Sequence, residues 1–145
     1  MGGRLRRPAG TAPSARHWRA ELGGGGWGDE QLQTYTDDPA NVALDGAGRL
    51  AIVARRRPAD GAVTSARLIT KGLVAARHGR IEARIKVPAG RGVWAAFWLL
   101  GTDIDAVGWP RCGEIDAIGH VGSRPRRCRS RAARTPPTRR GRRAP

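Results

Sequence analysis

The middle of the chain, residues 20–122, is divided by glycine, proline and aspartate into short apolar runs. Residues 41–44 and 50–54 are two such runs around the loop 45–48, whose sequence Asp-Gly-Ala-Gly is typical of a β-hairpin. No stretch of this region has a long amphipathic pattern with a period of 3.6 residues, and no internal repeat is visible. The pattern therefore predicts an all-β fold of the sandwich type.

Further strands are expected along the same region. Residues 65–70 form one short extended run, and residues 80–87 alternate strictly between apolar and charged side chains, which predicts a strand with one buried face. Residues 93–100 are mostly apolar and rich in aromatic side chains, which predicts a strand buried on both faces. Residues 113–118 follow the Trp109-Pro110 turn and predict one more short strand.

The charge is segregated along the chain. The sequence has 27 Lys and Arg against 12 Asp and Glu, and residues 20–122 contain equal numbers of each sign. The net charge of +15 therefore belongs to the two ends, which contain arginine and no acidic residue. This division predicts a basic, disordered N-terminal segment over 1–17, a folded domain over 18–122 and an Arg/Pro-rich tail over 123–145. Because the tail has no aromatic or branched aliphatic residue to bury, we expect it to be disordered.

Composition also bears on partners and location. A pI of 11.8 makes nonspecific contact between the arginine-rich tail and a polyanion one hypothesis. The sequence has no apolar run of about 18 residues, so no membrane partner is expected. The first 13 residues lack the apolar stretch of a secretory signal, so no signal peptide is expected in this chain. Cys112 and Cys128 are predicted to be free thiols.

Two carboxylates are the first candidates for chemistry. On a strand, Glu114 and Asp116 lie on the same face, while Ile115 and Ala117 lie on the other. Neighbouring carboxylates repel each other, and such unfavourable pairs gather at active sites. The alternative is that both carboxylates form the solvated face of an edge strand.

Tryptophans stand close to these carboxylates in the sequence. Trp94 and Trp98 are four residues apart, hence on one strand face, and Trp109 precedes Glu114 by five residues. Flat indole surfaces next to carboxylates suit sugar rings, whose C–H faces stack on aromatic groups. The alternative is that each tryptophan belongs to the core. We favour a cleft that binds carbohydrate.

Consecutive segments of the chain together resemble the bacterial laminarinase-like, or endo-β-1,3-glucanase, branch of glycoside hydrolase family 16. The matching segments occur in order at residues 24–28 and 30–36, 41–42, 65–67, 79–86, 94–100 and 108–116. The resemblance implies a β-jelly-roll sandwich of the concanavalin-like type, incomplete at its C-terminal side because the chain is expected to be truncated. It also implies an extracellular protein that hydrolyses β-1,3 or mixed-linkage glucans with retention of configuration. No cofactor is expected, and no calcium ligand set can be matched.

The resemblance also assigns roles within the family's catalytic pattern Glu-x-Asp-x-x-Glu. Glu114 matches the nucleophile and Asp116 matches the carboxylate that positions and tunes the pair, while Trp94, Trp98 and Trp109 are expected to bind substrate. The third position of the pattern, which carries the general acid/base in the family, is occupied by glycine. We therefore expect a catalytically impaired hydrolase.

The position that carries the general acid/base in the family is Gly119 in this chain. A side chain at 119 shares the face of Glu114 and Asp116 only if the strand contains a bulge. If the bulge is lost, strict alternation would turn His120 toward the cleft as a substitute proton donor. Two rivals to hydrolysis stay open: a glucan-binding remnant without catalysis, and a basic polyanion-binding protein.

Overall fold

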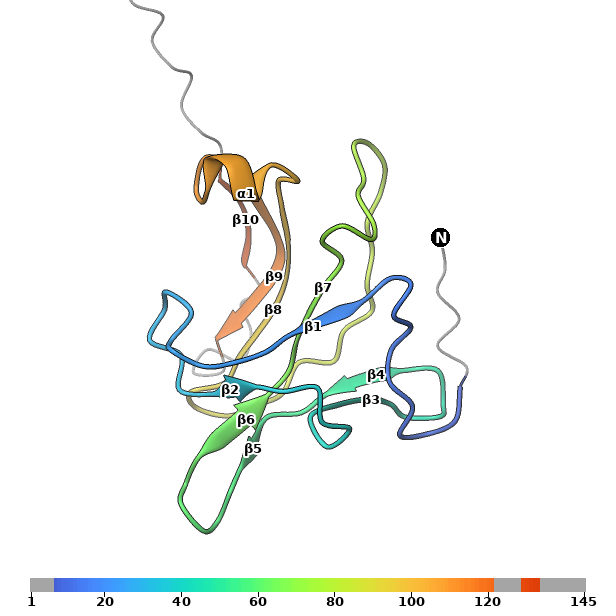
Figure 1. Cartoon of the computed structure of the whole chain (residues 1–145), viewed down its shortest axis with the longest axis vertical. Coiled ribbons are helices and arrows are strands. Elements are labelled where there is room, and N and C mark those ends of the chain that lie inside the picture. Colours follow the sequence, from blue (N-terminus) through green and yellow to red (C-terminus); the bar gives the residue numbers. More distant parts are fainter. Residues whose placement is uncertain (1–6, 122–128, 134–145) are drawn as a thin grey trace, which may run out of the picture. The chain divides into compact units, whose positions relative to one another are not determined.

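The computed structural model describes residues 7–121 and 129–133, and their secondary structure is almost entirely β. The one short helix is α1 (Ile104–Val107). The strands are β1 (Arg19–Glu21), β2 (Thr34–Tyr35), β3 (Val42–Leu44), β4 (Leu50–Ile52), β5 (Arg55–Arg56), β6 (Val63–Ser65), β7 (Arg67–Ile69), β8 (Trp94–Leu100), β9 (Glu114–Val121) and β10 (Arg129–Ala133). The all-β prediction is confirmed (Figure 1).

The chain divides into two compact units, which we call the N-terminal unit (Met1–Arg77) and the C-terminal unit (His78–Pro145). In the N-terminal unit, β1 pairs with β7, β3 pairs with β4, and β6 lies between β2 and β5 (Figure 1). In the C-terminal unit, β9 lies between β10 and β8, with antiparallel pairing on both sides.

The predicted hairpin is confirmed as β3 and β4. Its register pairs Val42 with Ile52 and Leu44 with Leu50, and the connecting loop places Gly46 and Gly48 at φ values of 77° and 85°. Such left-handed backbone is readily adopted by glycine, because glycine has no Cβ. The glycines of the loop therefore supply the conformation that turns the chain back.

The buried residues of the described chain all lie in the N-terminal unit: Asn41, Val42, Leu44 and Ala66. Asn41 is 3% exposed, and its side-chain amide is hydrogen-bonded at both ends. It accepts a hydrogen bond from Thr36 Oγ1 at 2.7 Å and donates one to the carbonyl of Val53 at 2.9 Å. A buried amide with both ends bonded avoids the cost of unsatisfied polar groups.

The chain ahead of β1 also belongs with this core. Gly10 N–H donates to the Leu44 carbonyl at 2.9 Å, and Leu44 N–H donates to the Thr11 carbonyl at 2.8 Å. These hydrogen bonds hold residues 10–11 along β3, ahead of the boundary at residue 18 that the sequence suggested. Residues 1–6 of the segment expected to be disordered lie outside the described residues.

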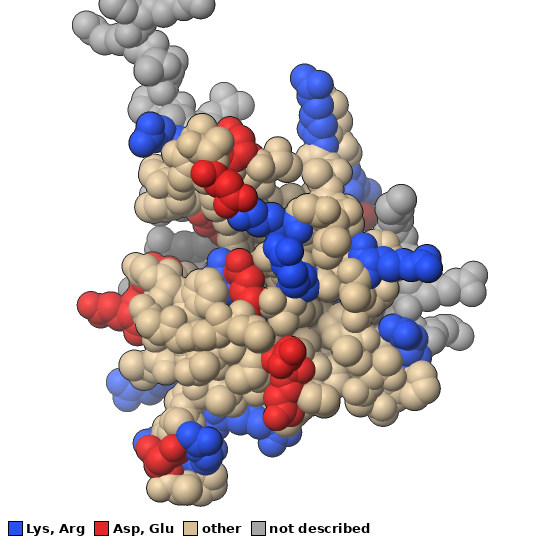
Figure 2. Space-filling view, in the orientation of Figure 1, with Lys and Arg blue, Asp and Glu red and all other residues tan. Residues whose placement is uncertain are grey.

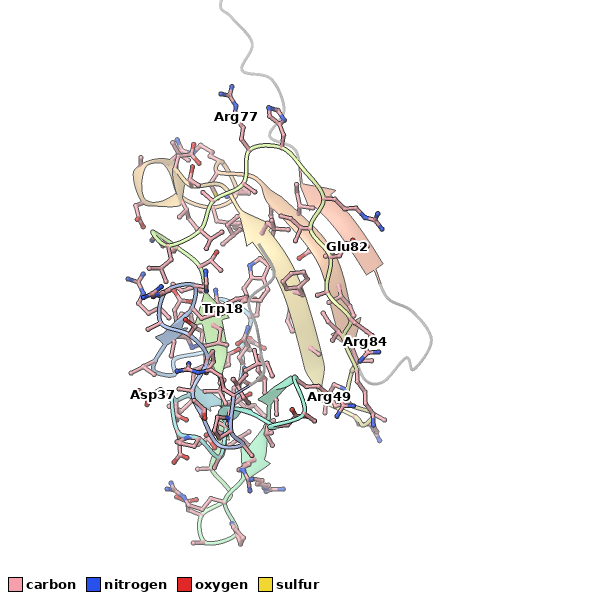
Figure 3. All side chains as sticks on the ribbon, turned by 90° about the vertical axis from the view of Figure 1, so that its right-hand side faces the viewer. Trp18, Asp37, Arg49, Arg77, Glu82 and Arg84 are labelled. Atoms are coloured by element: carbon pink, nitrogen blue, oxygen red, sulfur yellow. The ribbon has the colours of Figure 1, made fainter. Side chains whose placement is uncertain are left out.

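The predicted strand over 80–87 is wrong. The structure has no strand there, and Figure 3 draws the segment that carries Glu82 and Arg84 as a loop rather than an arrow. Ile81 and Ile85, expected to be buried, are 46% and 44% exposed. Alternation predicts a face, but a strand also needs a hydrogen-bonded neighbour, and none of the described residues pairs with this segment.

The prediction for residues 93–100 is right about the strand and wrong about its burial. β8 contains no buried residue, and Trp94 at its start is 54% exposed. Every residue of β8 is at least partly exposed, so the strand is not buried on both faces. The predicted strand 113–118 is confirmed as β9, which extends to Val121.

The arginine-rich tail contributes one strand to the described chain. β10 pairs antiparallel with β9, with Arg129 opposite Gly119 and Ala133 opposite Glu114. The rest of the tail expected to be disordered, residues 123–128 and 134–145, lies outside the described residues.

Candidate functional site

Glu114 and Asp116 lie at the start of β9 on one face of the sheet. Both are partly buried, whereas the intervening Ile115 is 57% exposed and Ala117 is exposed as well. The register places Leu100 opposite Glu114 and Trp98 opposite Asp116. Directly opposed residues of an antiparallel pair share a face, so Trp98 and the two carboxylates belong to the same face. We call this surface of β8 and β9 the carboxylate face.

A β-bulge interrupts the pairing next to Asp116. Phe97 lies opposite Ile118 and Trp98 lies opposite Asp116, so Ala117 is an extra residue on β9. Beyond the bulge, Ala96 lies opposite Gly119. Ala96 and Trp98 are two residues apart on a regular strand, which returns position 119 to the carboxylate face. The face therefore has a third position on β9, and glycine occupies it.

The bulge also decides the place of His120. Its backbone pairs with Ala95, and Ala95 lies on the other face of β8 from Ala96 and Trp98. His120 was expected to turn toward the cleft only if the strand had no bulge, and that condition is not met because the bulge is present. The register is set by hydrogen bonding to β8 rather than by the periodicity of β9 itself.

Trp109 reaches the carboxylate face from the loop between α1 and β9. Its Nε1 donates a hydrogen bond to Glu114 Oε2 at 2.6 Å, and its side chain is exposed, with 66% of the residue accessible. Hydrogen bonds to a charged acceptor are shorter and stronger than neutral ones. The indole therefore orients one carboxylate oxygen and still offers its ring to solvent.

The loop that carries Trp109 is held by its own backbone. Gly108 N–H donates to the Ile104 carbonyl at 2.8 Å and closes α1, and Cys112 N–H donates to the Gly108 carbonyl at 3.0 Å. Gly101, directly after β8, is needed because a Cβ there would overlap the carbonyl oxygen of Cys112. This close approach ties the end of β8 to the loop just before Glu114.

The three sequence-predicted tryptophans thus have different relations to the carboxylates. Trp98 is opposite Asp116, Trp109 is bonded to Glu114, and Trp94 lies at the far end of β8. Between Trp94 and Trp98, the carboxylate face carries only the small residues Ala96 and Gly119. The structure brings two of the three tryptophans to the carboxylates.

A second tryptophan cluster lies in the N-terminal unit and was not predicted from the sequence. Trp27 stacks edge to face on Tyr35 with 5.4 Å between ring centroids, and Arg67 Cζ lies 4.8 Å from the Trp27 ring centroid. Arg67 also pairs with Glu21, with 2.5 Å between Nε and Oε2. The contacts join residues up to 46 positions apart, so no local pattern signals them.

Metal and membrane sites are not found in the described part of the chain. Within residues 7–121 and 129–133, no group of three or more His, Cys, Asp or Glu is placed to hold a metal ion. The same residues include no helix of the length and apolarity needed to cross a bilayer.

The family model described as glycosyl hydrolases family 16 matches residues 27–132. A β-glucanase from Rhodothermus marinus is 44% identical over 117 residues, which cover 78% of this chain and 41% of that protein. A β-1,3-glucan-binding protein from Penaeus monodon is 44% identical over 61 residues, which cover 42% of this chain and 17% of that protein.

Solved structures give the same result for the fold. The crystal structure of a laminarinase from Flavobacterium sp. UMI-01 is similar with a TM-score of 0.76 and 40% identity, over 82% of this chain and 51% of that chain. This similarity confirms the predicted β-jelly-roll class. The chain spans about half the length of the laminarinase and less than half of the Rhodothermus enzyme.

Proposed function

The chain belongs to family 16 of the glycosyl hydrolases, in its laminarinase-like branch, and from this premise we propose that it binds β-1,3 or mixed-linkage glucans on the carboxylate face. The observation that carries the proposal is the placement of Glu114 and Asp116 on one face with Trp98 opposite and Trp109 bonded to Glu114. Sugar rings stack on exposed aromatic side chains while carboxylates meet their hydroxyls and anomeric centre.

In this proposal Glu114 is the nucleophile of a retaining mechanism. Its carboxylate attacks the anomeric carbon and forms a glycosyl ester, and Asp116 positions and tunes it from two residues away on the same face. The Trp109 N–H bond to Glu114 supports this role, because it fixes the orientation of one carboxylate oxygen.

The same proposal predicts that natural glucans are cleaved poorly. A retaining glycosidase needs a second carboxyl group about 5–5.5 Å from the nucleophile to protonate the leaving oxygen. The register position for it on β9 is Gly119, which has no side chain. General acid–base assistance is worth about 10²–10⁴-fold in rate, so its absence leaves binding with little turnover.

The test compares the full chain with its Gly119→Glu variant on laminarin, measuring reducing sugar. We expect no release above background from the natural sequence and measurable release from Gly119→Glu. The double variant Gly119→Glu, Glu114→Gln is the control, and it should lose the gained activity. Turnover by the unaltered chain at the level of a complete laminarinase would contradict the assignment of the missing acid.

Binding of glucan without cleavage is the second candidate. It is favoured by the similarity of residues in this chain to the Penaeus β-1,3-glucan-binding protein. Laminarin affinity, measured by calorimetry, should fall about fivefold in Trp109→Ala, which corresponds to about 1 kcal/mol for an aromatic contact. Trp18→Ala in the N-terminal unit is the matched control, and equal losses at both positions would exclude an ordered binding face.

Contact of the arginine-rich tail with polyanions is a separate proposal. Residues 123–145 carry ten arginines and no acidic residue. If the tail neutralises phosphates, DNA affinity of the full chain should fall steeply with salt and be lost when the arginines of 139–143 are replaced by glutamine. A salt-independent affinity would contradict it.

A further inference from the structure

The chain between β7 and β8 contains a stretch, residues 75–92, that we call the open segment. Among the described residues 7–121 and 129–133, no backbone–backbone hydrogen bond forms within this segment or joins it to another residue. Every residue of the segment is exposed except Val87, which is partly buried. Its peptide N–H and C=O groups are therefore available to a partner that binds extended backbone.

The open segment is also basic. It contains one acidic residue, Glu82. Its arginines and lysine are Arg77, Arg80, Arg84, Lys86 and Arg91. Exposed backbone next to arginine or lysine meets the requirements of trypsin-type serine proteases, whose specificity pocket has a carboxylate at its base. Exposed loops are also the preferred sites of proteolytic nicking. The segment therefore fits an arginine-specific protease as a partner.

Arg77 is the residue of the open segment best placed for such a pocket. It is exposed and forms no ion pair with a described residue, and Figure 3 shows its side chain pointing away from the ribbon. The nearest acidic residue in the sequence is Glu82, five positions later. The neighbours Ala76 and Gly79 are small, so they offer little steric hindrance to the cleft of an enzyme.

The next arginine of the segment is less available. Arg80 Nη2 pairs with Glu82 Oε1 at 2.5 Å. The Glu82 carboxylate competes with the carboxylate of the protease for the same guanidinium and repels it. Because this ion pair is exposed, it is weak, and we expect it to slow cleavage after Arg80 rather than prevent it.

We infer that the peptide bond between Arg77 and His78 is a processing site for an arginine-specific serine protease. The boundary between the two compact units falls at the same bond. Cleavage there leaves the buried residues on one product and the carboxylate face, with Glu114 and Asp116, on the other. This modification is independent of the role proposed for Glu114 in glucan binding.

The reaction is a hydrolysis and needs only water as co-reactant. The serine oxygen of the protease attacks the carbonyl carbon of Arg77, and the bond from that carbon to the nitrogen of His78 breaks. The leaving amine takes the proton that the histidine of the protease removed from the serine. Water then cleaves the resulting ester and restores the serine. The products are a carboxylate on Arg77 and a free amino group on His78.

Arg56 provides an internal comparison. It is exposed, as Arg77 is, but it lies in β5, whose backbone pairs with β6 and places Arg56 opposite Val63. A protease can bind the backbone at Arg56 only after β5 separates from β6, and this local opening costs free energy. The bond after Arg77 needs no such opening.

The experiment treats the full chain with a catalytic amount of trypsin and follows new N-termini by sequencing and intact mass. We expect His78 to be the first new N-terminus within residues 7–121, formed on the order of 10-fold faster than the terminus after Arg56. In urea, where both bonds are open, the two rates should converge. A first cut after Arg56 or Arg80, or a ratio of rates that urea does not change, would overturn the inference.

Two matched variants test the position of the cut. Arg77→Gln should abolish the His78 terminus, because glutamine has no charge for the specificity pocket, whereas Arg56→Gln should leave the rate of its formation unchanged. Both residues are exposed and neither forms an ion pair with a described residue, so both variants should keep the urea midpoint of the unaltered chain. Continued cleavage before His78 in Arg77→Gln, or equal slowing in both variants, would contradict the assignment to Arg77.

Discussion

Trp27 of the N-terminal unit and Trp109 of the C-terminal unit each donate an indole N–H, but to different kinds of partner. Trp27 bonds to the neutral carbonyl of Gly23 at 3.2 Å, and Tyr35 and Arg67 lie against its ring. Trp109 bonds to the carboxylate of Glu114 and is 66% exposed. The Trp27 indole therefore makes contacts within the fold, whereas the exposed ring of Trp109 is accessible to a ligand.

The two units also differ in how many of their residues are buried. Both units expose large apolar side chains, such as Leu32 at 88% and Trp109 at 66%, but the four buried residues of the described chain all lie in the N-terminal unit. In Figure 2, acidic and basic side chains meet at the tip of the β5–β6 loop, where Arg57 pairs with Asp60 at 2.6 Å. The buried core therefore lies in the N-terminal unit, whereas the exposed Trp109 and its partner Glu114 lie in the C-terminal unit.

Truncation of the buried core should have the largest effect on stability. Leu44 is 2% exposed, so Leu44→Ala should lower the free energy of unfolding by about 2–5 kcal/mol, through lost apolar contact and a residual cavity. Urea denaturation followed by circular dichroism measures it. Ile115→Ala, at a residue 57% exposed, should change stability by about 0.5 kcal/mol or less. Equal losses in the two units would break the comparison.

The next largest effect is expected from the ion pairs, which should contribute different amounts to the free energy of unfolding in the two units. Arg67 pairs with Glu21 where the side chains are only 19% and 29% exposed, and it also covers the Trp27 ring. Arg67→Met should therefore cost about 1–2 kcal/mol of unfolding free energy. Arg80 pairs with Glu82 at 82% and 64% exposure, so Arg80→Met should cost about 0–0.5 kcal/mol in the same denaturation assay. The reverse order would show that solvent screening does not separate the pairs.

How far the sequence predicts this fold depends on how local each signal is. The hairpin β3–β4 was predictable because Gly46 and Gly48 mark the turn between two apolar runs. The segment 80–87 has the strongest alternation in the chain and forms no strand, because alternation does not provide a pairing partner.

The candidate site shows the same limit. The shared face of Glu114 and Asp116 followed from their spacing on a strand. The position of the bulge did not, although the alternation of polar and apolar residues breaks at Ala117 and Ile118, which are both apolar. Only pairing with β8 shows that position 119, rather than position 120, lies on the same face as the carboxylates. The bond from Trp109 to Glu114 likewise depends on a loop closed by Gly101 and Gly108, which periodicity does not describe.

Removal of each indole N–H should separate structural from functional roles. Trp27→Phe loses the bond to the Gly23 carbonyl and should lower the free energy of unfolding by about 1 kcal/mol, with laminarin affinity retained. Trp109→Phe keeps an aromatic ring but no longer orients Glu114, so it should weaken laminarin binding, measured by calorimetry, with little change in stability. Loss of laminarin affinity in both variants, or in neither, would contradict the distinction.

The smallest expected effect is acid sensitivity at the tip of the β5–β6 loop. A side-chain hydrogen bond from Arg57 lowers the pKa of Asp60 from its ordinary value of 3.8 to about 2, and the backbone N–H of Ala62 adds to this effect. Because the folded pKa lies below the unfolded one, the stabilisation is fully present above pH 3.8 and is lost as the pH falls toward 2. Asp60→Asn should therefore reduce the decline of the unfolding midpoint between pH 4 and pH 2 by a small amount, since both partners are exposed. An NMR titration of the Asp60 carboxyl measures the pKa directly, and Arg57→Gln should bring it back toward 3.8. An Asp60 pKa near 3.8 in the unaltered chain would show that the loop does not hold this pair in solution, and would remove one of the contacts that distinguish the N-terminal unit.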